Sequence, residues 1–136
     1  MLTTIVLQTE SGESLVNITD KLRVAVKESG VLEGICVVYV PHTTAALTVN
    51  SAMDPNTPLD IVDEVHRIVP TRVDFQHIYD TPADAAGHVK ASLIGGDLSL
   101  IITGGELLLG GSQSVMFFEF DGPRSRKVVV RIMADV

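Results

Sequence analysis

The alternation of apolar and polar positions predicts a chain that mixes short strands with a few helices. Segments rich in Val, Ile and Thr and bounded by Gly, Pro or Asn have the composition of β-strands. Seven segments fit this description, at residues 3–10, 33–40, 42–49, 97–103, 106–109, 114–121 and 127–134. Within them, residues 115–118 and 128–130 are apolar at consecutive positions, which is typical of strands buried on both faces. Gly-rich turns join the last four segments, and we expect a mostly antiparallel arrangement.

Three further segments repeat apolar residues at the spacing of a helix. The first begins where Asn17 or Thr19 could supply a cap, and it ends at Gly30. The other two open with Thr57-Pro58-Leu59-Asp60 and Thr81-Pro82-Ala83-Asp84 and end at Pro70 and Gly95-Gly96. Each opening offers a capping threonine, a proline at the first helical position and an aspartate at the third. The sequence therefore predicts one α+β domain over residues 1–136.

Composition narrows the classes of partner. Hydrophobic residues make up 46% of the chain and charged residues 20%, as in a globular domain. The net charge of −7 argues against nonspecific binding to nucleic acid and against an anionic membrane surface. We identify no signal peptide and no apolar span long enough to cross a membrane. The single cysteine, Cys36, lies in an apolar run and is expected to be a buried thiol, so a reducing, cytoplasmic location is expected.

One short segment concentrates opposite charges around a Gly-Pro turn. Glu119 and Asp121 share one parity of the incoming strand, and Arg124 and Arg126 share one face of the outgoing strand. Charges at the end of a buried hairpin are costly unless they are paired or used. Two interpretations stay open: a solvated turn with arginine–carboxylate pairs, or one wall of a site for an anionic ligand.

Histidines are the second source of candidate chemistry. His66 falls on the polar side of its helix and is expected to be a surface residue, whereas His42 and His77 lie next to predicted strand or helix ends. Asp84 and His88 are four residues apart and share one helix face, while Lys90 falls on the far side. Asp84 also has a purely structural interpretation, as the third residue of a capping box.

Three histidines and an aspartate offer imidazole and carboxylate ligands for a divalent metal. The chain lacks the HExxH and CxxC spacings of common metal sites. The histidines could instead carry protons, because their pKa lies near neutrality. Gly104-Gly105 and Gly110-Gly111-Ser112-Gln113 likewise allow two interpretations: backbone N–H groups that bind phosphate, or tight hairpin turns.

Several of these segments together, in chain order, resemble the YjbQ-like family, which is described as secondary thiamine-phosphate synthase enzymes. The segments that carry the resemblance are Pro41-His42-Thr43-Thr44-Ala45-Ala46-Leu47-Thr48-Val49-Asn50, His77, Gly87-His88-Val89-Lys90-Ala91-Ser92-Leu93-Ile94-Gly95, Gly105-Glu106-Leu107-Leu108-Leu109-Gly110 and Glu119-Phe120-Asp121-Gly122-Pro123-Arg124. The resemblance covers nearly the whole chain. It implies a β-rich α+β sandwich that assembles as a homotrimer, with a polar cleft built around three histidines.

The resemblance also implies roles for individual residues. The cleft histidines would be His42, His77 and His88, which form the expected ligand set for a divalent metal such as zinc or magnesium. For catalysis we expect His42, His88 and Glu119. For binding a phosphate group we expect Thr43, Thr44, Ser92 and Arg124.

The activity that the resemblance suggests is the joining of a hydroxymethylpyrimidine diphosphate to a thiazole phosphate. It looks like a secondary activity of the family, so the primary role stays open. The partners expected are thus a small phosphate-bearing molecule and further copies of the chain, with no nucleic acid and no membrane. One alternative is a non-catalytic trimer that binds a small anion or a metal, and another is that the polar residues only stabilise subunit contacts.

The chain departs from the family pattern at two places. Asn50-Ser51 stands where relatives usually carry Asn-Glu, so a carboxylate is absent. Gly110-Gly111-Ser112-Gln113 stands where they usually carry Gly-Thr-Trp-Gln, so an aromatic stacking surface is absent. Both changes weaken the transfer of the activity more than the transfer of the fold.

Overall fold

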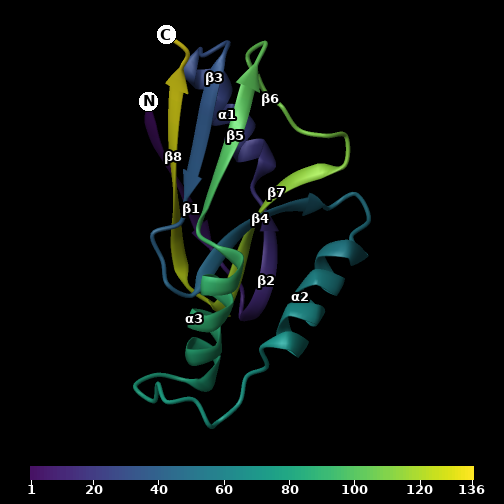
Figure 1. Cartoon of the computed structure of the whole chain (residues 1–136), viewed down its shortest axis with the longest axis vertical. Helices are drawn as coiled ribbons and strands as arrows, with labels where there is room; N and C mark the ends of the chain where they lie inside the picture. The colour runs from purple at the N-terminus through teal and green to yellow at the C-terminus, as the bar shows by residue number, and fades with distance from the viewer.

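The computed structural model describes all 136 residues and has three helices and eight strands in two antiparallel sheets (Figure 1). The expected α+β class and mostly antiparallel sandwich are confirmed. The strands are β1 (Leu2–Gln8), β2 (Gly12–Asn17), β3 (Gly34–Tyr39), β4 (Ala45–Ser51), β5 (Asp97–Thr103), β6 (Glu106–Leu107), β7 (Gln113–Gly122) and β8 (Ser125–Ala134). The helices are α1 (Thr19–Ser29), α2 (Asn56–Ile68) and α3 (Pro82–Ile94).

The strands divide into a large and a small sheet. The large sheet has the order β1-β8-β3-β5-β6, and the small sheet has the order β2-β7-β4. Strands β7 and β8 are joined by the charged turn but belong to different sheets. The turn that carries the four charges therefore lies where the two sheets meet. Because β1 pairs along β8, both chain termini lie at the opposite end of the molecule (Figure 1).

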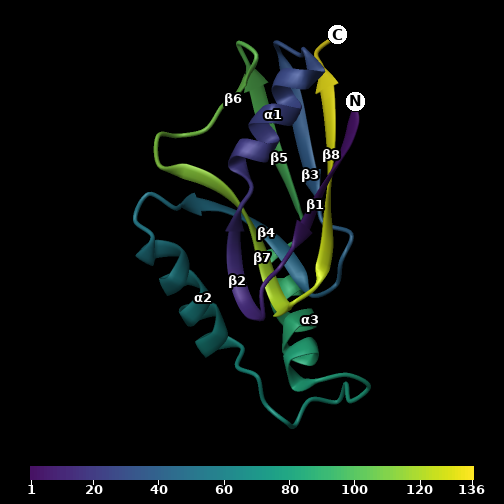
Figure 2. The ribbon, with the colours of Figure 1, turned by 180° about the vertical axis from the view of Figure 1, so that it is seen from behind.

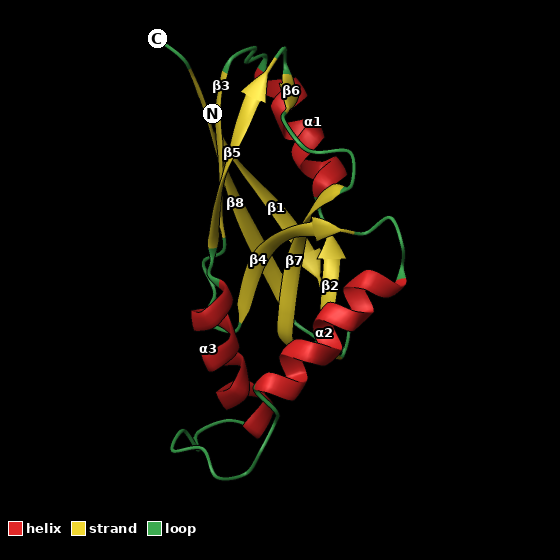
Figure 3. Ribbon diagram, turned by 45° about the vertical axis from the view of Figure 1, so that its right-hand side comes forward, coloured by secondary structure: helices red, strands yellow, loops and turns green.

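The main core lies between the two sheets, and α1 shares it. It contains 18 buried apolar residues, contributed by both sheets and by α1. Figure 2 shows α1 lying against one face of the large sheet. A smaller cluster of Ala46, Phe118 and Phe120 covers the other face of the small sheet, where α2 and α3 pack. Figure 3 shows both helices beside the small sheet. The lone thiol of Cys36 is buried, as expected, and burial raises its pKa to about 11.

The two strands expected to be buried on both faces differ. Strand β7 is buried at every position from Val115 to Phe120, between the main core and the helices. Strand β8 instead alternates, with Val128 and Val130 buried and Arg131 exposed. The reason is that the outer face of the large sheet has no helix on it, as the front of Figure 1 shows.

One strand was not predicted, and several boundaries differ from those predicted. Strand β2 was not expected, because its Gly-Glu-Ser-Leu-Val-Asn sequence is too polar to predict a strand; it pairs only with β7. Strand β4 begins at Ala45, so His42 precedes it. Helix α2 begins at Asn56 without a capping side chain from Thr57, because the Asp54 carboxylate accepts the Asn56 N–H at 2.9 Å. Helix α3 does have the predicted cap, with Thr81 Oγ1 accepting the Asp84 N–H.

Candidate metal and anion site

A polar cleft of about 430 Å³ lies at the end of the main core where α3 begins and where the β7–β8 turn closes. No apolar side chain other than proline lines it. It draws on segments far apart in the sequence: the residues before β4, the loop before α3, the first turns of α3, and the turn into β8. The lining residues are Pro41, His42, Thr43, Thr44, His77, Asp80, Asp84, His88, Arg124 and Arg126.

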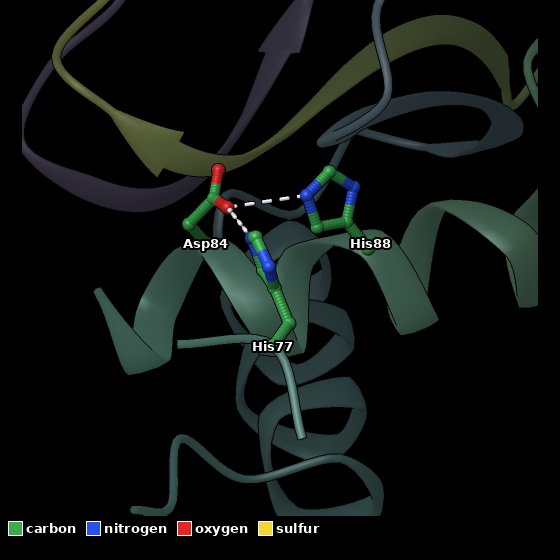
Figure 4. Close-up of side chains that lie close together, drawn as sticks. All are labelled: His77, Asp84 and His88. Atoms are coloured by element: carbon green, nitrogen blue, oxygen red, sulfur yellow. Dashed lines mark hydrogen bonds and ion pairs between the residues drawn. The ribbon is translucent and has the colours of Figure 1, made fainter. Parts of the chain in front are cut away.

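One wall of the cleft carries two histidines that converge on one carboxylate. Nε2 of His77 lies 2.9 Å from Asp84 Oδ2, and Nε2 of His88 lies 3.1 Å from the same oxygen (Figure 4). The potential ligand atoms of the three residues all lie within 4.8 Å of one another. The Thr81 cap holds Asp84 in the first turn of α3. His88 lies four residues later on the same helix face, and His77 comes from the loop before the helix.

The carboxylate of Asp84 stays ionised although it is largely buried. Burial alone would raise its pKa, but the hydrogen bonds and charges of His77 and His88 outweigh burial and hold the pKa below its usual value. Since both imidazoles donate an Nε2 proton to this oxygen, a divalent ion at the same point would take the place of those protons. Two neutral imidazole nitrogens and one carboxylate oxygen are a ligand set that suits zinc and leaves a coordination position open. The residues present therefore fit such an ion.

His42 lines the cleft but stands apart from this cluster. Its Nε2 accepts the backbone N–H of Lys127 at 2.9 Å, which leaves Nδ1 as the ring nitrogen that carries a proton in the neutral state. Burial, with the charge of Arg126 next in size, lowers the pKa of His42. The three side chains that converge are therefore His77, Asp84 and His88, whereas His42, the third metal ligand expected from the sequence, is not part of this cluster.

Glu119 lies beneath the cleft and does not line it. Its carboxylate is fully buried and forms a two-point ion pair with the guanidinium of Arg126. Thr9 Oγ1 donates to it at 2.5 Å and the Asp121 N–H at 3.3 Å. These donors occupy its oxygens, so Glu119 lies outside the cleft lining with its hydrogen bonds made inside the chain; the catalytic role expected from the sequence stays a prediction.

The four residues expected to bind phosphate line two neighbouring spaces, the cleft and a hollow beside it. Arg124 lines the cleft, where its Nη2 lies 2.7 Å from Asp121 Oδ2 and 3.9 Å from Asp84 Oδ1. Thr43 and Thr44 also line it. Ser92 lies in an adjoining hollow of about 300 Å³, which shares His42, Thr43 and His88 with the cleft.

Two cleft residues were missed by the sequence analysis as ligands. Asp80 follows His77 in the loop, where no periodicity marks it. Arg126 has the same parity as the buried Val128 and Val130 of β8, and that parity is the signal that could have placed it inside. The arginines of the charged turn are paired with carboxylates, as the first interpretation expected, but the Arg126–Glu119 pair is buried rather than solvated. Both arginines also line the cleft, and an anionic ligand there stays a prediction.

The first glycine-rich turn is a hairpin, since Gly104-Gly105 joins the paired strands β5 and β6, whereas residues 110–113 form a turn that leads from β6 to β7 in the other sheet. The Gly104 N–H donates to Glu33 Oε1 at 3.0 Å and the Gly105 N–H to the Leu32 carbonyl at 3.0 Å. The Gly110 N–H donates to the Gln113 side chain at 2.8 Å. Since these donors are occupied, they are not available to a phosphate.

Comparison with known proteins gives one consistent result. The model of the family described as UPF0047 protein YjbQ-like matches residues 3–135. The chain belongs to the YjbQ-like family. A UPF0047 protein of Methanocaldococcus jannaschii is 40% identical over 95% of this chain and 91% of its own length. The UPF0047 protein YugU of Bacillus subtilis is 32% identical over 98% of this chain and 99% of its own length.

Solved structures of YjbQ-like proteins share the fold. An uncharacterised conserved protein of the YjbQ/UPF0047 family from Clostridium acetobutylicum is 40% identical, with a TM-score of 0.90 over 96% of this chain and 99% of that chain. A protein of unknown function from Sulfolobus solfataricus is 28% identical, with a TM-score of 0.93 over 99% of this chain and 97% of that chain. None of these names states an activity.

The two departures from the YjbQ-like pattern lie away from the cleft. Ser51 pairs with Gln113 at the far end of β4, about 20 Å along the strand from Ala45 beside the cleft. Ser112 directly precedes that Gln113. Within one chain, neither substitution removes a cleft side chain. None of the three helices combines the length and apolar composition needed to cross a membrane.

Proposed function

We propose that the protein holds a divalent cation through His77, Asp84 and His88 and binds a small phosphate-bearing molecule beside it in the same cleft. The observation that carries this proposal is the convergence of two imidazole nitrogens and one carboxylate within 4.8 Å on the wall of a cleft that two arginines also line. Imidazole ligands favour zinc over magnesium, which prefers oxygen ligands.

The charges that line the cleft explain why cation and anion would bind together. Arg124 and Arg126 are balanced by Asp80 and Asp84 when the histidines are neutral. Glu119 and Asp121, which pair with these arginines, add two negative charges, so a bound divalent cation brings the local charge from −2 to zero on a chain whose net charge is −7. A phosphate group then finds a local attraction to the cation that the molecule as a whole does not offer.

The reaction proposed is the one that the family resemblance suggests, in which a hydroxymethylpyrimidine diphosphate is joined to a thiazole phosphate. It would be a secondary activity. A bound divalent ion would supply charge neutralisation for the departing diphosphate. Arg124 and the hydroxyls of Thr43 and Thr44 would bind phosphate oxygens. Because the Nε2 of His42 accepts the Lys127 N–H, its Nδ1–H would donate a hydrogen bond to the ligand.

The test starts with the metal. We expect protein purified without chelator to carry close to one zinc per chain, measured by elemental analysis. Asp84→Asn, which removes the shared charged ligand, should lower zinc affinity by at least about tenfold. His66→Ala is the matched control, because this histidine lies on α2 outside the cleft. Equal zinc content in wild type and Asp84→Asn would refute the metal site.

Turnover of the pyrimidine and thiazole pair by the zinc-loaded protein then tests the activity. We expect product from the wild type and none above background from His88→Ala. A second candidate function is a non-catalytic protein that binds a small anion or metal, and the complete pairing of Glu119 favours it. That candidate predicts calorimetric binding of zinc and phosphate with no turnover in any variant.

We also propose that the protein assembles as a homotrimer, as the resemblance implies. The support is the uncovered outer face of the large sheet, where Ile35, Tyr39, Ile101 and Met133 are all exposed. An apolar surface of this kind commonly marks an association site.

A further inference from the structure

We infer that Arg126 holds the phosphate at the floor of the cleft, and that the rest of the ligand is a compact uncharged group in the adjoining hollow. This inference rests on the proposed function, because it specifies how the ligand of that cleft is oriented and what class of molecule it is. It concerns a residue that resemblance to the family did not bring into the site.

Arg126 has one hydrogen-bonding group left for a ligand. Its Nε and Nη2 donate to the Glu119 carboxylate, and Nη2 also donates to Thr44 Oγ1 at 2.8 Å. The remaining terminal nitrogen, Nη1, has no hydrogen-bond partner in the chain, and it is not fully enclosed, since the only enclosed and unpartnered side-chain atom is Ser14 Oγ. Since Arg126 lines the cleft, we infer that Nη1 is open to the cleft.

The position of this guanidinium is fixed before any ligand arrives. The Arg126 side chain is 5% exposed and that of Glu119 is 0% exposed. Thr9 and the Asp121 N–H hold the carboxylate from its other sides, so the ion pair is oriented with its positive end toward the cleft. A preoriented donor with little access to water binds an anion more strongly than a solvated one.

Arg124 is a weaker candidate for the same task. Its side chain is 45% exposed, and its Nη2 is paired with Asp121 at 2.7 Å. Both arginines are paired with a carboxylate, but a charge as exposed as that of Arg124 is also screened by water and counterions. We therefore place Arg124 at the rim, where it contacts the phosphate second.

The adjoining hollow defines the rest of the ligand. His42, Thr43 and His88 line both spaces and form the passage between them. Beyond them the hollow is lined only by small uncharged residues, Ala45, Ala91, Ser92 and Gly96. With about 300 Å³ and no charge to pair, it suits one small ring or short chain. The ligand class is thus a phosphate monoester with a small neutral organic group.

Calorimetry with inorganic phosphate and with phenyl phosphate tests the anchor, on both zinc-loaded and metal-free protein. Arg126→Lys keeps the charge beside Glu119 but loses the two-point pair and the free Nη1. We expect this substitution to lower the affinity for both compounds by at least about tenfold, with and without zinc. The matched substitution Arg124→Lys should change affinity by less than about threefold. Equal effects of the two substitutions would overturn the assignment.

A wild-type measurement covers the case in which Arg126→Lys fails to fold. In a crystal structure soaked with inorganic phosphate, we expect a phosphate oxygen within hydrogen-bond distance of Arg126 Nη1. Phosphate bound at Arg124 alone, or elsewhere, would contradict the inference. If the zinc-loaded wild type binds no phosphate at all, the proposed function itself fails. If it binds phosphate but Arg126 makes no contact with it, only the assignment of Arg126 fails.

Ser92 provides the test of the hollow, because it lies on the exposed side of α3 and lines this space. Ser92→Leu should fill the hollow and lower the affinity for phenyl phosphate by at least about tenfold, while the affinity for inorganic phosphate stays that of the wild type. Ser92→Ala removes the hydroxyl but keeps the hollow open, so it should bind phenyl phosphate more tightly than Ser92→Leu does. A parallel loss of both compounds in Ser92→Leu, or no loss of either, would show that the organic group lies elsewhere.

Discussion

At the scale of single residues, the two buried carboxylates of the site, Glu119 and Asp84, differ in their hydrogen-bond partners. Glu119 is held by Arg126 and Thr9 and fixes the floor of the cleft. Asp84 is held by two imidazole donors, whose places at the carboxylate a metal could take. The difference lies in their partners: a guanidinium cannot give up its charge near neutral pH, whereas an imidazole can exchange its proton for a metal.

Replacing Glu119 by glutamine should destabilise the fold in a pH-dependent way. Burial alone would raise the pKa of Glu119, but hydrogen bonds from Arg126 and Thr9 outweigh it and hold the pKa below its ordinary value of 4.5. The stabilisation from ionised Glu119 is therefore complete above the unfolded-state pKa and is lost as pH falls through the folded-state pKa. Glu119→Gln should cost about 3 kcal/mol at pH 7 and flatten the loss of stability below about pH 5.

Urea unfolding of both proteins from pH 7 to pH 3 measures this effect. Glu64→Gln is the control, because Glu64 pairs with Arg67 on an exposed helix face, where water screens the pair and its contribution to stability is small. If Glu119→Gln were as stable as Glu64→Gln at pH 7, the Arg126 pair would not support the fold as described.

Local spacing explains which site residues the sequence could place. Asp84 and His88 are related by helix geometry, so their shared face followed from the sequence. Convergence of His77 on them depends on a loop without periodicity, and only the structure shows it. Lys90 gives the clearest example: the helical wheel put it away from Asp84, but its burial against Glu13 depended on β2, which the sequence analysis lacked.

At the scale of elements, one close contact between α3 and the small sheet positions the cleft. A Cβ atom at Gly87 would lie 3.2 Å from the Thr44 Cβ and 3.3 Å from the Phe120 Cβ. Thr44 cannot move aside freely, because its hydroxyl and its carbonyl both accept from Arg126. Glycine therefore lets the helix approach closely enough to bring Asp84 and His88 to the turn that carries Arg124.

Gly87→Val should push α3 away from the sheet. We expect a loss of about 2 kcal/mol in the free energy of unfolding and weaker zinc binding, since overpacking strains a rigid contact. Ser92→Val, on the exposed side of the same helix, controls for the low helix propensity of valine. Matching stability for the two variants would show that α3 does not need this contact.

Helix α2 is attached more loosely than α3. None of its residues is buried, and it contacts the small sheet through the half-buried Ile61, Val62 and Val65. One further contact joins His66 Nδ1 to Glu13 at 2.8 Å. Elements with so little buried apolar surface open before the whole molecule unfolds.

Hydrogen exchange should therefore be faster in α2 than in α3 or β7. Val65→Ala should accelerate exchange in α2 by about fivefold, from a loss near 1 kcal/mol, and leave β7 unchanged. The exposed Leu59 provides the control variant Leu59→Ala. Equal acceleration in β7 would mean that α2 and the sheet unfold together.

At the scale of the whole molecule, the fold is built with one open side. The main core and the helices cover both faces of the small sheet but only one face of the large sheet. The register places Ile35 beside Ile101 on one neighbouring strand and beside Met133 on the other, and all three point outward. The apolar run at residues 115–118, which is typical of a strand buried on both faces, is covered on both faces within its own chain.

Assembly through this open face is the prediction that follows for the homotrimer. Sedimentation of the wild type at micromolar concentration should give about three times the 14.6 kDa mass of one chain. Ile35→Lys places a charge in the middle of the Ile35, Ile101 and Met133 row, where burial against another chain would leave it unpaired, so we expect a folded monomer. Leu59→Lys puts the same charge on the exposed surface of α2 and should leave the assembly intact. A wild type that sediments as a monomer, or an Ile35→Lys variant that remains trimeric, would show that copies of the chain do not cover this face.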